Sequence, residues 1–244
     1  MQLQLAERRT APNLLVLLRK ALQLDSQAVV RVAMRQNSGL ARVWVTTPFG
    51  PIGCRTMEIS PEAVVRADHV ARSLESELAG KPEAGSGAGS GDGFVDDPDD
   101  QPLLIEAGAD VTISWPGALP PDTGWQLVDY VPATVIRELE QQGQQVAANE
   151  SGPLGLPPSL LDNTVLTVQG EETPPEDTGK TTPKPQKVEL SMREIFALCG
   201  LGFIPAQPAE SEIVRVSQRG RWKRLDGRFG SLYTQSNLGV LPLG

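Results

Sequence analysis

Two stretches of the chain share one pattern, and this pattern constrains the fold more than any other feature. Residues 212–233 alternate polar and apolar side chains, turn at Arg219 and Gly220, and return through a stretch with Arg and Trp. Residues 28–53 repeat this order: a Val-Arg-Val step, a Gly-containing turn, an Arg/Trp return and then Phe-Gly. Alternation with a period of two between Gly turns is typical of β-hairpins. The sequence therefore predicts a hairpin near each end. An internal repeat is one interpretation of the pattern that the two stretches share.

The register of each hairpin follows from the length of its loop. In the first, a four-residue loop at 36–39 places the valines of both strands on one face and the Arg and Trp side chains on the other. A three-residue loop would shift the register by one and turn Trp44 toward the core; we favour the four-residue loop because it separates apolar from polar side chains. In the second, a two-residue turn at 219–220 predicts Arg215 opposite Arg224.

Helical periodicity and capping signals mark three further segments. Residues 12–24 carry a wide apolar face after Pro12, which suits a first helical turn. Residues 60–79 begin with Ser-Pro-Glu, a typical helix start. Residues 190–201 begin with a capping box in which Ser191 is followed three residues later by Glu194. Weaker patterns predict strands at 52–59, 109–115 and 164–168 and a helix from Val131 that Gly143 ends.

These elements predict an α+β fold, with an antiparallel sheet built from the N- and C-terminal hairpins and packed by the three helices. Two stretches rich in Gly, Ser, Pro and acidic residues separate the ordered segments, and such composition is typical of linkers. The predicted organisation is a helix-hairpin-helix unit at 1–80, a disordered linker at 81–102, a smaller central α/β segment at 103–168, a Pro-rich linker at 169–187, and a helix with a basic hairpin at 188–244.

Charge is distributed unevenly along the chain. The net charge of −8 is the sum of +5 over residues 1–74, −18 over residues 75–178 and +5 over residues 179–244. Two basic ends therefore flank an acidic middle. The pI near 4.8 argues against a nucleic-acid-binding domain, which is expected to be basic.

The residues that enzymes and metal sites need are sparse. His69 is the only histidine, and Cys54 and Cys199 are the only cysteines, so neither a catalytic set with histidine nor a zinc site is indicated. The Gly-rich run at 85–93 lacks the Lys of a phosphate-binding loop. We predict no enzyme activity, no cofactor and no metal, and we expect both cysteines to be reduced.

No apolar run is long enough for a membrane span, and the five-residue run at 14–18 is too short for a secretory signal. These patterns predict a cytoplasmic protein that does not enter a membrane.

The basic hairpin faces are the one signal of binding. Arginines beside a tryptophan can contact carboxylates, or can neutralise phosphates while the ring stacks on a base. The candidate binding face comprises Arg31, Arg35, Arg42, Trp44, Arg215, Trp222 and Arg224. Our hypothesis is a non-enzymatic interaction protein whose hairpin faces contact an acidic protein partner or its own acidic middle; the alternative is nucleic-acid binding through the same residues.

Residues 124–143 and 156–168, together with the closing Trp-containing hairpin, resemble a family of uncharacterised conserved proteins from high-GC Gram-positive bacteria of the actinobacterial type. This resemblance implies a cytoplasmic bacterial protein and supplies no activity, cofactor or catalytic residue.

Overall fold

The computed structural model describes residues 1–35, 38–80, 98–150, 158–170 and 187–235, which divide into two compact units. The first unit comprises Met1–Pro48 and Cys54–Gly117, and the second comprises Phe49–Gly53 and Ala118–Gly244. Residues 103–117 therefore belong to the first unit and residues 118–168 to the second. Both units combine helices with antiparallel strands, which confirms the α+β class.

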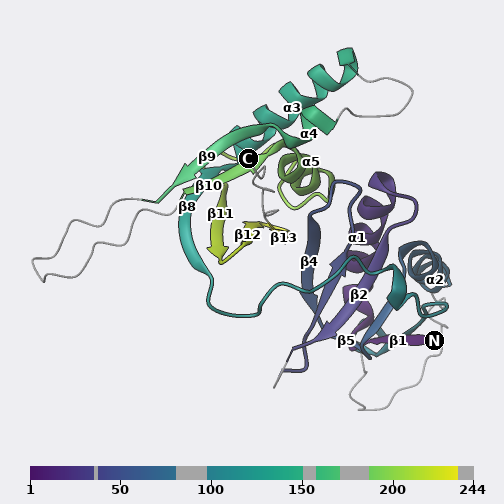
Figure 1. Ribbon diagram of the computed structural model, residues 1–244. Helices are drawn as coiled ribbons and strands as arrows, with labels where there is room; N and C mark the ends of the chain where they lie inside the picture. The colour runs from purple at the N-terminus through teal and green to yellow at the C-terminus, as the bar shows by residue number, and fades with distance from the viewer. Residues whose placement is uncertain (36–37, 81–97, 151–157, 171–186, 236–244) are drawn as a thin grey trace, which may run out of the picture. The chain divides into compact units, whose positions relative to one another are not determined.

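The first unit contains the elements up to residue 117 (Figure 1). These are β1 (Gln2–Leu5), η1 (Arg8–Thr10), α1 (Ala11–Leu24), β2 (Val29–Met34), β3 (Ala41–Val45), β4 (Ile52–Met57), β5 (Ile59–Ser60), β6 (Ala63–Arg66), α2 (Ala67–Ala79), η2 (Pro98–Asp100), β7 (Leu103–Glu106) and η3 (Thr112–Ser114). The first two residues of β4 lie in the second unit.

The second unit contains the remaining elements. These are β8 (Gln126–Pro132), α3 (Ala133–Glu150), α4 (Pro158–Asp162), β9 (Thr164–Gln169), β10 (Lys187–Ser191), α5 (Met192–Gly200), β11 (Ile213–Arg219), β12 (Trp222–Gly227) and β13 (Gly230–Gln235). Strands β13, β12, β11 and β8 follow one another across its larger sheet, and β10 pairs with β9 in a smaller one.

Both units are assembled from the same two pieces. One is a strand, a helix and three strands, which appears as β1-α1-β2-β3-β4 and as β10-α5-β11-β12-β13; the other is β6-α2-β7 or β8-α3-β9. The pairing also corresponds, because β7 and β6 pair antiparallel with β1 and β2 as β9 and β8 pair with β10 and β11. The long piece comes first in the first unit and last in the second. The two stretches that share a sequence pattern therefore form equivalent strands, β2-β3 and β11-β12.

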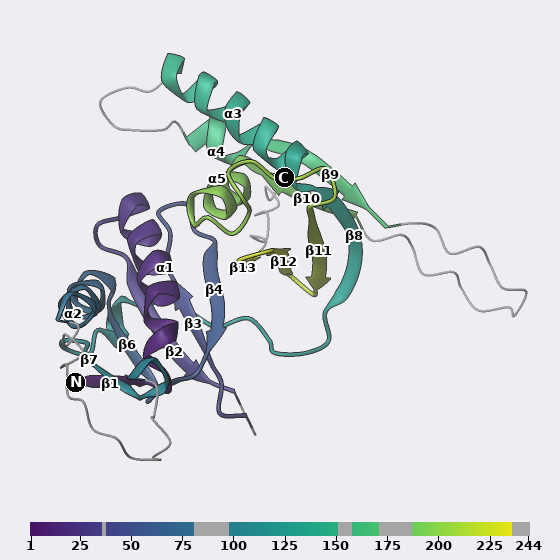
Figure 2. The same cartoon turned by 180° about the vertical axis from the view of Figure 1, so that it is seen from behind.

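The core of the first unit lies between two helices and one face of a sheet. Figures 1 and 2 show α1 and α2 side by side against the strands β6, β2 and β3. Leu14, Leu17 and Leu18 of α1 and Leu74 of α2 are buried. Each such leucine contributes roughly 1.5–3 kcal/mol relative to an exposed one. The predicted helix at 12–24 is confirmed.

The helix predicted at 60–79 begins later than its cap suggests. Residues 63–66 form β6, and α2 starts at Ala67. Val64 and Val65 are both buried, and Val65 lies opposite Val30 of β2. Adjacent β-branched residues buried on both faces favour a strand, and this pairing overrides the capping signal at Ser60.

The predicted strand at 109–115 is wrong. This segment is irregular, apart from the single 3-10 turn η3. The carboxylate of Asp110 accepts the Thr112 amide at 2.9 Å, a local bond that competes with strand pairing. The segment is nevertheless attached to the sheet, since the Val111 amide donates to the Val64 carbonyl at 2.8 Å.

The helix predicted from Val131 to Gly143 differs at both ends. Residues 126–132 form β8, and α3 runs from Ala133 through Gly143 to Glu150. Gly143 does not end the helix; it allows a neighbour to approach closely. A Cβ at this position would lie 2.6 Å from the Met192 sulfur and 2.9 Å from Phe196 Cζ.

Helix α5 confirms the predicted capping box of Ser191 and Glu194. Its C-terminus is closed by Gly202 with φ of 68°. The Gly202 amide donates to the Cys199 carbonyl at 2.9 Å, and the Phe203 amide donates to the Leu198 carbonyl at 3.1 Å. This pair of bonds is a Schellman motif, which requires a left-handed residue and so favours glycine.

Phe203, which follows this motif, is fully buried in the second unit. Three glycines leave room for its ring and backbone. A Cβ would lie 2.4 Å from Phe203 Cε1 at Gly230, 2.5 Å from the Phe203 carbonyl oxygen at Gly227, and 2.9 Å from Phe203 Cζ at Gly53. The loop after α5 thus packs directly on the backbone of neighbouring strands.

A buried ion pair connects β12 to the start of α5. Lys223 forms an ion pair with Glu194, and its Nζ also donates to the Glu189 carbonyl at 2.8 Å. The side chains of Lys223 and Glu194 are 12% and 1% exposed. Because a charge in this environment is costly without its partner, each residue depends on the other.

We expect Gly230→Ala to destabilise the protein by about 1–3 kcal/mol, because the added methyl group collides with the Phe203 ring. Urea unfolding followed by tryptophan fluorescence measures the loss. Gly39→Ala is the control, since a Cβ there meets nothing within 4 Å. Equal stability of the two variants would contradict the close packing at Phe203.

We expect Lys223→Met to destabilise the protein by roughly 3–5 kcal/mol, because it leaves the Glu194 carboxylate buried without a cation. Adding Glu194→Gln should recover part of the loss, since Gln removes the charge and retains a capping side chain. Thermal unfolding of both variants gives the comparison. A double variant less stable than Lys223→Met would show that the ion pair is not the source of the effect.

Candidate interaction surface

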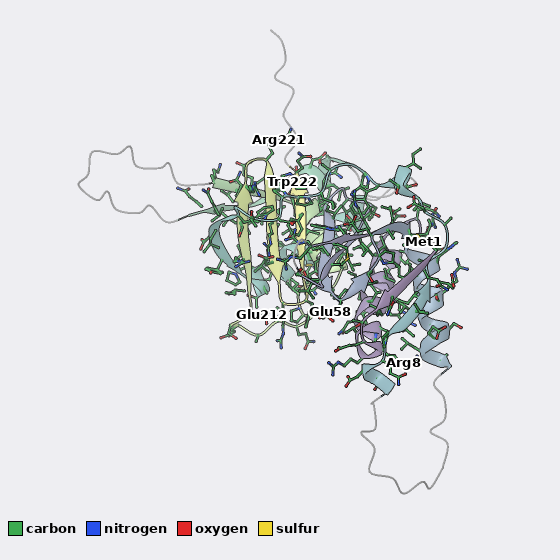
Figure 3. The ribbon with its side chains drawn as sticks, turned by 90° about the horizontal axis from the view of Figure 1, so that it is seen from below. Met1, Arg8, Glu58, Glu212, Arg221 and Trp222 are labelled. Carbon is green, nitrogen blue, oxygen red and sulfur yellow. The ribbon has the colours of Figure 1, made fainter. Side chains whose placement is uncertain are left out.

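The larger sheet of the second unit has two chemically different faces. Register and alternation place Val131, Val214, Val216, Leu225 and Leu232 on the buried side. The other side, called the outer face below, carries Leu127, Tyr130 and Pro132 of β8; Ile213, Arg215, Ser217 and Arg219 of β11; Trp222, Arg224 and Asp226 of β12; and Ser231, Tyr233 and Gln235 of β13. Figure 3 shows Arg221 and Trp222 at one end of the β11–β12 hairpin and Glu212 at the other.

The register of this hairpin differs from the prediction. Arg219 pairs with Trp222, so Gly220 and Arg221 form the turn, and Gly220 has φ of 56°. Arg215 therefore lies opposite Asp226 and not opposite Arg224. The shift amounts to two residues, so every side chain keeps its predicted face while its partner changes. An ion pair replaces the predicted pair of like charges.

Two aromatic rings and an arginine contact one another at the outer face. Trp125 and Tyr233 meet edge to face, with ring centroids 5.5 Å apart and planes at 70°. The Arg224 guanidinium carbon lies 5.9 Å from the Trp125 centroid and 5.6 Å from the Tyr233 centroid. The indole N–H of Trp125 donates to the Pro121 carbonyl at 2.9 Å. These contacts fix Arg224 as a structural group.

Asp226 pairs with Arg215 of the neighbouring strand β11 and with Arg224 of its own strand β12. Its Oδ2 accepts Nε and Nη2 of Arg215 at 2.9 and 2.8 Å, and its Oδ1 accepts Arg224 Nε at 2.6 Å and the Ser231 hydroxyl at 2.5 Å. One carboxylate therefore compensates two guanidinium groups. Charge-assisted bonds of this kind are about twice as strong as neutral ones.

Large apolar side chains on the same face are exposed to solvent. Leu127 is 50%, Tyr130 48% and Ile213 48% exposed. In the register, Tyr130 lies opposite Arg215, and Ile213 lies two residues before Arg215 on the same strand. Diagonal neighbours in a sheet are within reach of large side chains, so these residues form a continuous apolar strip along β8 and β11.

The four candidate residues of the first hairpin occupy a different environment. The register predicted for this hairpin is confirmed, since Arg31 pairs with Trp44 and Ala33 with Arg42. Trp44 is 1% and Arg42 9% exposed, and the two form a cation–π contact at 5.9 Å. Arg31 is half-buried beneath Trp115 at 5.6 Å, whereas Arg35 is exposed at the strand end.

The structure brings Arg215, Trp222 and Arg224 onto one face, as the sequence predicted. Sequence reasoning missed Leu127, Tyr130, Trp125 and Tyr233. The sequence analysis assigns no strand to residues 126–132 and begins a helix at Val131, because adjacent apolar residues in this stretch hide the alternation of a strand. A strand that contains proline at its end is typical of a sheet edge, and this signal could have identified β8.

The groups considered for catalysis are not part of the outer face. His69 is exposed on α2 with Asp68 at 4.0 Å. No group of three or more His, Cys, Asp or Glu side chains in the described residues is placed to hold a metal ion. In the same part of the chain, no helix is long and apolar enough to cross a membrane.

Cys199 lies in the interior of the second unit. Burial raises the pKa of its thiol far above the ordinary value, and the nearby Glu140 carboxylate raises it further. Arg137, which is paired with Glu140 at 2.6 Å, opposes this shift in the pKa. The thiol therefore stays protonated at neutral and mildly alkaline pH, where it is a poor nucleophile.

We expect neither Cys199 nor the equally buried Cys54 to react with a disulfide reagent such as DTNB at pH 8 in the native protein. Both should react after denaturation, because unfolding exposes the two thiols and restores the ordinary pKa of Cys199. Absorbance of the released thiolate counts the reacted groups. Ser211→Cys, at an exposed position, is the positive control. A fast-reacting native thiol that Cys199→Ser abolishes would contradict this assignment.

Two protein families match separate parts of the chain. Residues 1–90 match a family described as a domain of unknown function (DUF8010), and residues 120–239 match another described as a domain of unknown function (DUF8185). The second match covers most of the second unit and includes the whole outer face. No curated protein sequence matches the chain.

Solved structures similar to this chain are bacterial sliding clamps. The DNA polymerase sliding clamp from Bacillus subtilis aligns with a TM-score of 0.51 at 11% identity, and a putative DNA polymerase III beta subunit from Eubacterium rectale with 0.53 at 10%. The beta subunit from Pseudomonas aeruginosa gives 0.51 at 12%. Each alignment covers 99% of this chain and 66% of the clamp. The chain therefore has the sliding-clamp fold and spans 66% of the length of these clamps.

Proposed function

We propose that this protein is a non-enzymatic interaction protein whose outer face binds an acidic partner protein. The observation that carries the proposal is the apolar strip of Leu127, Tyr130 and Ile213 beside arginines on one ordered sheet. Aromatic residues and arginine are enriched among the residues that dominate binding energy in protein interfaces. Large apolar side chains that meet on an exposed face indicate an interaction site.

The fold supports the same proposal. The similar structures are named as sliding clamps or as beta subunits of DNA polymerase III, that is, as parts of an assembly. Fold alone does not determine function, so the assignment rests on the surface. The inner side of the sheet is filled by Phe203 and by the Lys223–Glu194 pair. On the outer face Ser217 and Tyr233 are buried, whereas Leu127, Tyr130 and Ile213 are exposed to a partner.

Binding to nucleic acid is the second candidate function. Arg221 and Trp222 at the hairpin end favour it, since a cation beside an aromatic ring can hold a nucleotide. Charge argues against it, because each unit carries 11 Lys and Arg residues against 15 Asp and Glu residues. Nucleic-acid-binding domains are expected to carry an excess of positive charge. We therefore rank a protein partner above nucleic acid.

We expect the full-length protein, used as bait in lysate of its native cells, to retain at least one protein that Tyr130→Ser combined with Ile213→Ser no longer retains. These changes remove two apolar contacts from the outer face. Mass spectrometry with quantification compares the baits. Ile113→Ser combined with Leu104→Ser is the control, since both residues are exposed apolar residues of the first unit, at 99% and 55%.

If the partner is a protein that binds directly, the bait retains it also after the lysate has been treated with nuclease. Loss after nuclease would support the nucleic-acid alternative instead. A set of retained proteins that is identical for the wild type and the outer-face variant would contradict the proposal that this face binds a partner.

A further inference from the structure

Along its length the outer face carries an apolar group at one end and cationic residues at the other, with Leu127 opposite Ser217 between them. The apolar end holds Ile213, Tyr130 and Pro132, where β8 and β11 pair next to Glu212. The cationic end holds the exposed Arg219 and the half-buried Trp222, and the exposed Arg221 lies in the adjoining turn. A ligand that uses the whole face must therefore offer different chemistry at its two ends.

The arginines at the two ends are not equivalent. Arg215 and Arg224 are compensated by Asp226, so little of their charge is left for a ligand. Arg219 donates to the Thr123 carbonyl, a neutral group that leaves its charge uncompensated. Arg221 has no hydrogen bond or ion pair with any residue in the described part of the chain. Because the charges of Arg219 and Arg221 are not compensated, carboxylates of a partner are attracted to the hairpin end of the face.

The spacing of the two ends sets the length of the ligand. Ile213 and Arg219 are six residues apart on β11. At about 3.3 Å per residue this separation is roughly 20 Å. An extended peptide has a similar rise, so a segment of about seven residues covers the face.

The edge of the sheet is not suited to accept this segment as an added strand. The Asp129 carboxylate accepts the Tyr130 amide at 2.7 Å, and Pro132 has no amide hydrogen. Both features block the hydrogen bonds on which strand addition depends. The ligand must bind across the face through its side chains.

A second copy of this chain does not satisfy the same face. In a two-fold contact the same patch meets itself, so Arg219 and Arg221 would face apolar residues or other arginines. No carboxylate of the outer face is free to pair with them, because Asp226 already holds Arg215 and Arg224. A partner protein with its own carboxylates therefore fits this face better than a two-fold dimer does.

Building on the proposed function, we infer that the outer face binds an extended acidic peptide segment of a partner protein. This segment is about seven residues long. A large apolar side chain packs on Tyr130 and Ile213, and two or more carboxylates four to six residues away pair with Arg219 and Arg221.

A random library of displayed 12-residue peptides, selected on the immobilised full-length protein, tests this inference. We expect the enriched peptides to carry two or more Asp or Glu residues at four to six positions from a Leu, Ile, Phe or Trp. Arg219→Ser combined with Arg221→Ser should abolish the enrichment. Arg35→Ser is the control, since Arg35 is an exposed arginine at the end of the other hairpin.

One enriched peptide is then synthesised with a fluorescent label, and its affinity is measured by anisotropy. We expect about a tenfold weaker Kd for the double arginine variant and also for Ile213→Ser, with a fall in affinity as salt increases. The Arg35→Ser variant should bind as the wild type does. Circular dichroism confirms that the variants are folded.

Enriched peptides that are basic, or apolar without carboxylates, would overturn the inference. Affinity unaffected by the arginine changes, or no enrichment at all, would overturn it as well. The lysate experiment separates these failures from a failure of the proposed function. A partner that is retained by wild type and lost by Tyr130→Ser with Ile213→Ser leaves the proposed function standing even if no acidic peptide binds.

Discussion

The packing of Phe203 against three glycines is the constraint on which the second unit depends. Phe203 follows a Schellman motif at the end of α5; a side chain at Gly53 or Gly230 would collide with its ring, and one at Gly227 would collide with its carbonyl oxygen. Arg137 reinforces this arrangement by donating to the carbonyls of Ile204 and Pro205 at 2.8 and 2.9 Å. Because the inner side of the sheet is fixed in this way, the positions of the side chains on the outer face are fixed too.

Local signals in the sequence predicted much of this architecture. The capping box at Ser191 predicted the start of α5, and the four-residue loop predicted the register of the first hairpin. In the second hairpin the turn was placed one residue early, since Gly220 occupies the first turn position and not the second. The resulting two-residue shift preserved the faces, so Arg215, Trp222 and Arg224 were correctly grouped although their partners were not.

Features that depend on distant residues could not be predicted in the same way. The burial of Trp44 and Arg42 depends on neighbours that the hairpin pattern does not contain, so an alternating polar face was interpreted as exposed. Trp125 contacts Tyr233 across more than 100 residues of sequence, and β6 exists because Val65 pairs with Val30. The two structural pieces that recur in both units stand in opposite order along the chain. A search for direct sequence repeats therefore does not detect them.

The charges on the outer face show why a count of arginines is a poor measure of binding capacity. Asp226 converts Arg215 and Arg224 into structural groups, and Trp125 and Tyr233 hold Arg224 in place. Only the arginines near the turn keep charge that a ligand can use. The second unit carries more acidic than basic residues. Its small cationic region attracts phosphates, but it cannot compensate the many phosphates of a nucleic acid. It can compensate two or three carboxylates. The scale of the available charge therefore matches a short acidic segment better than a polyanion.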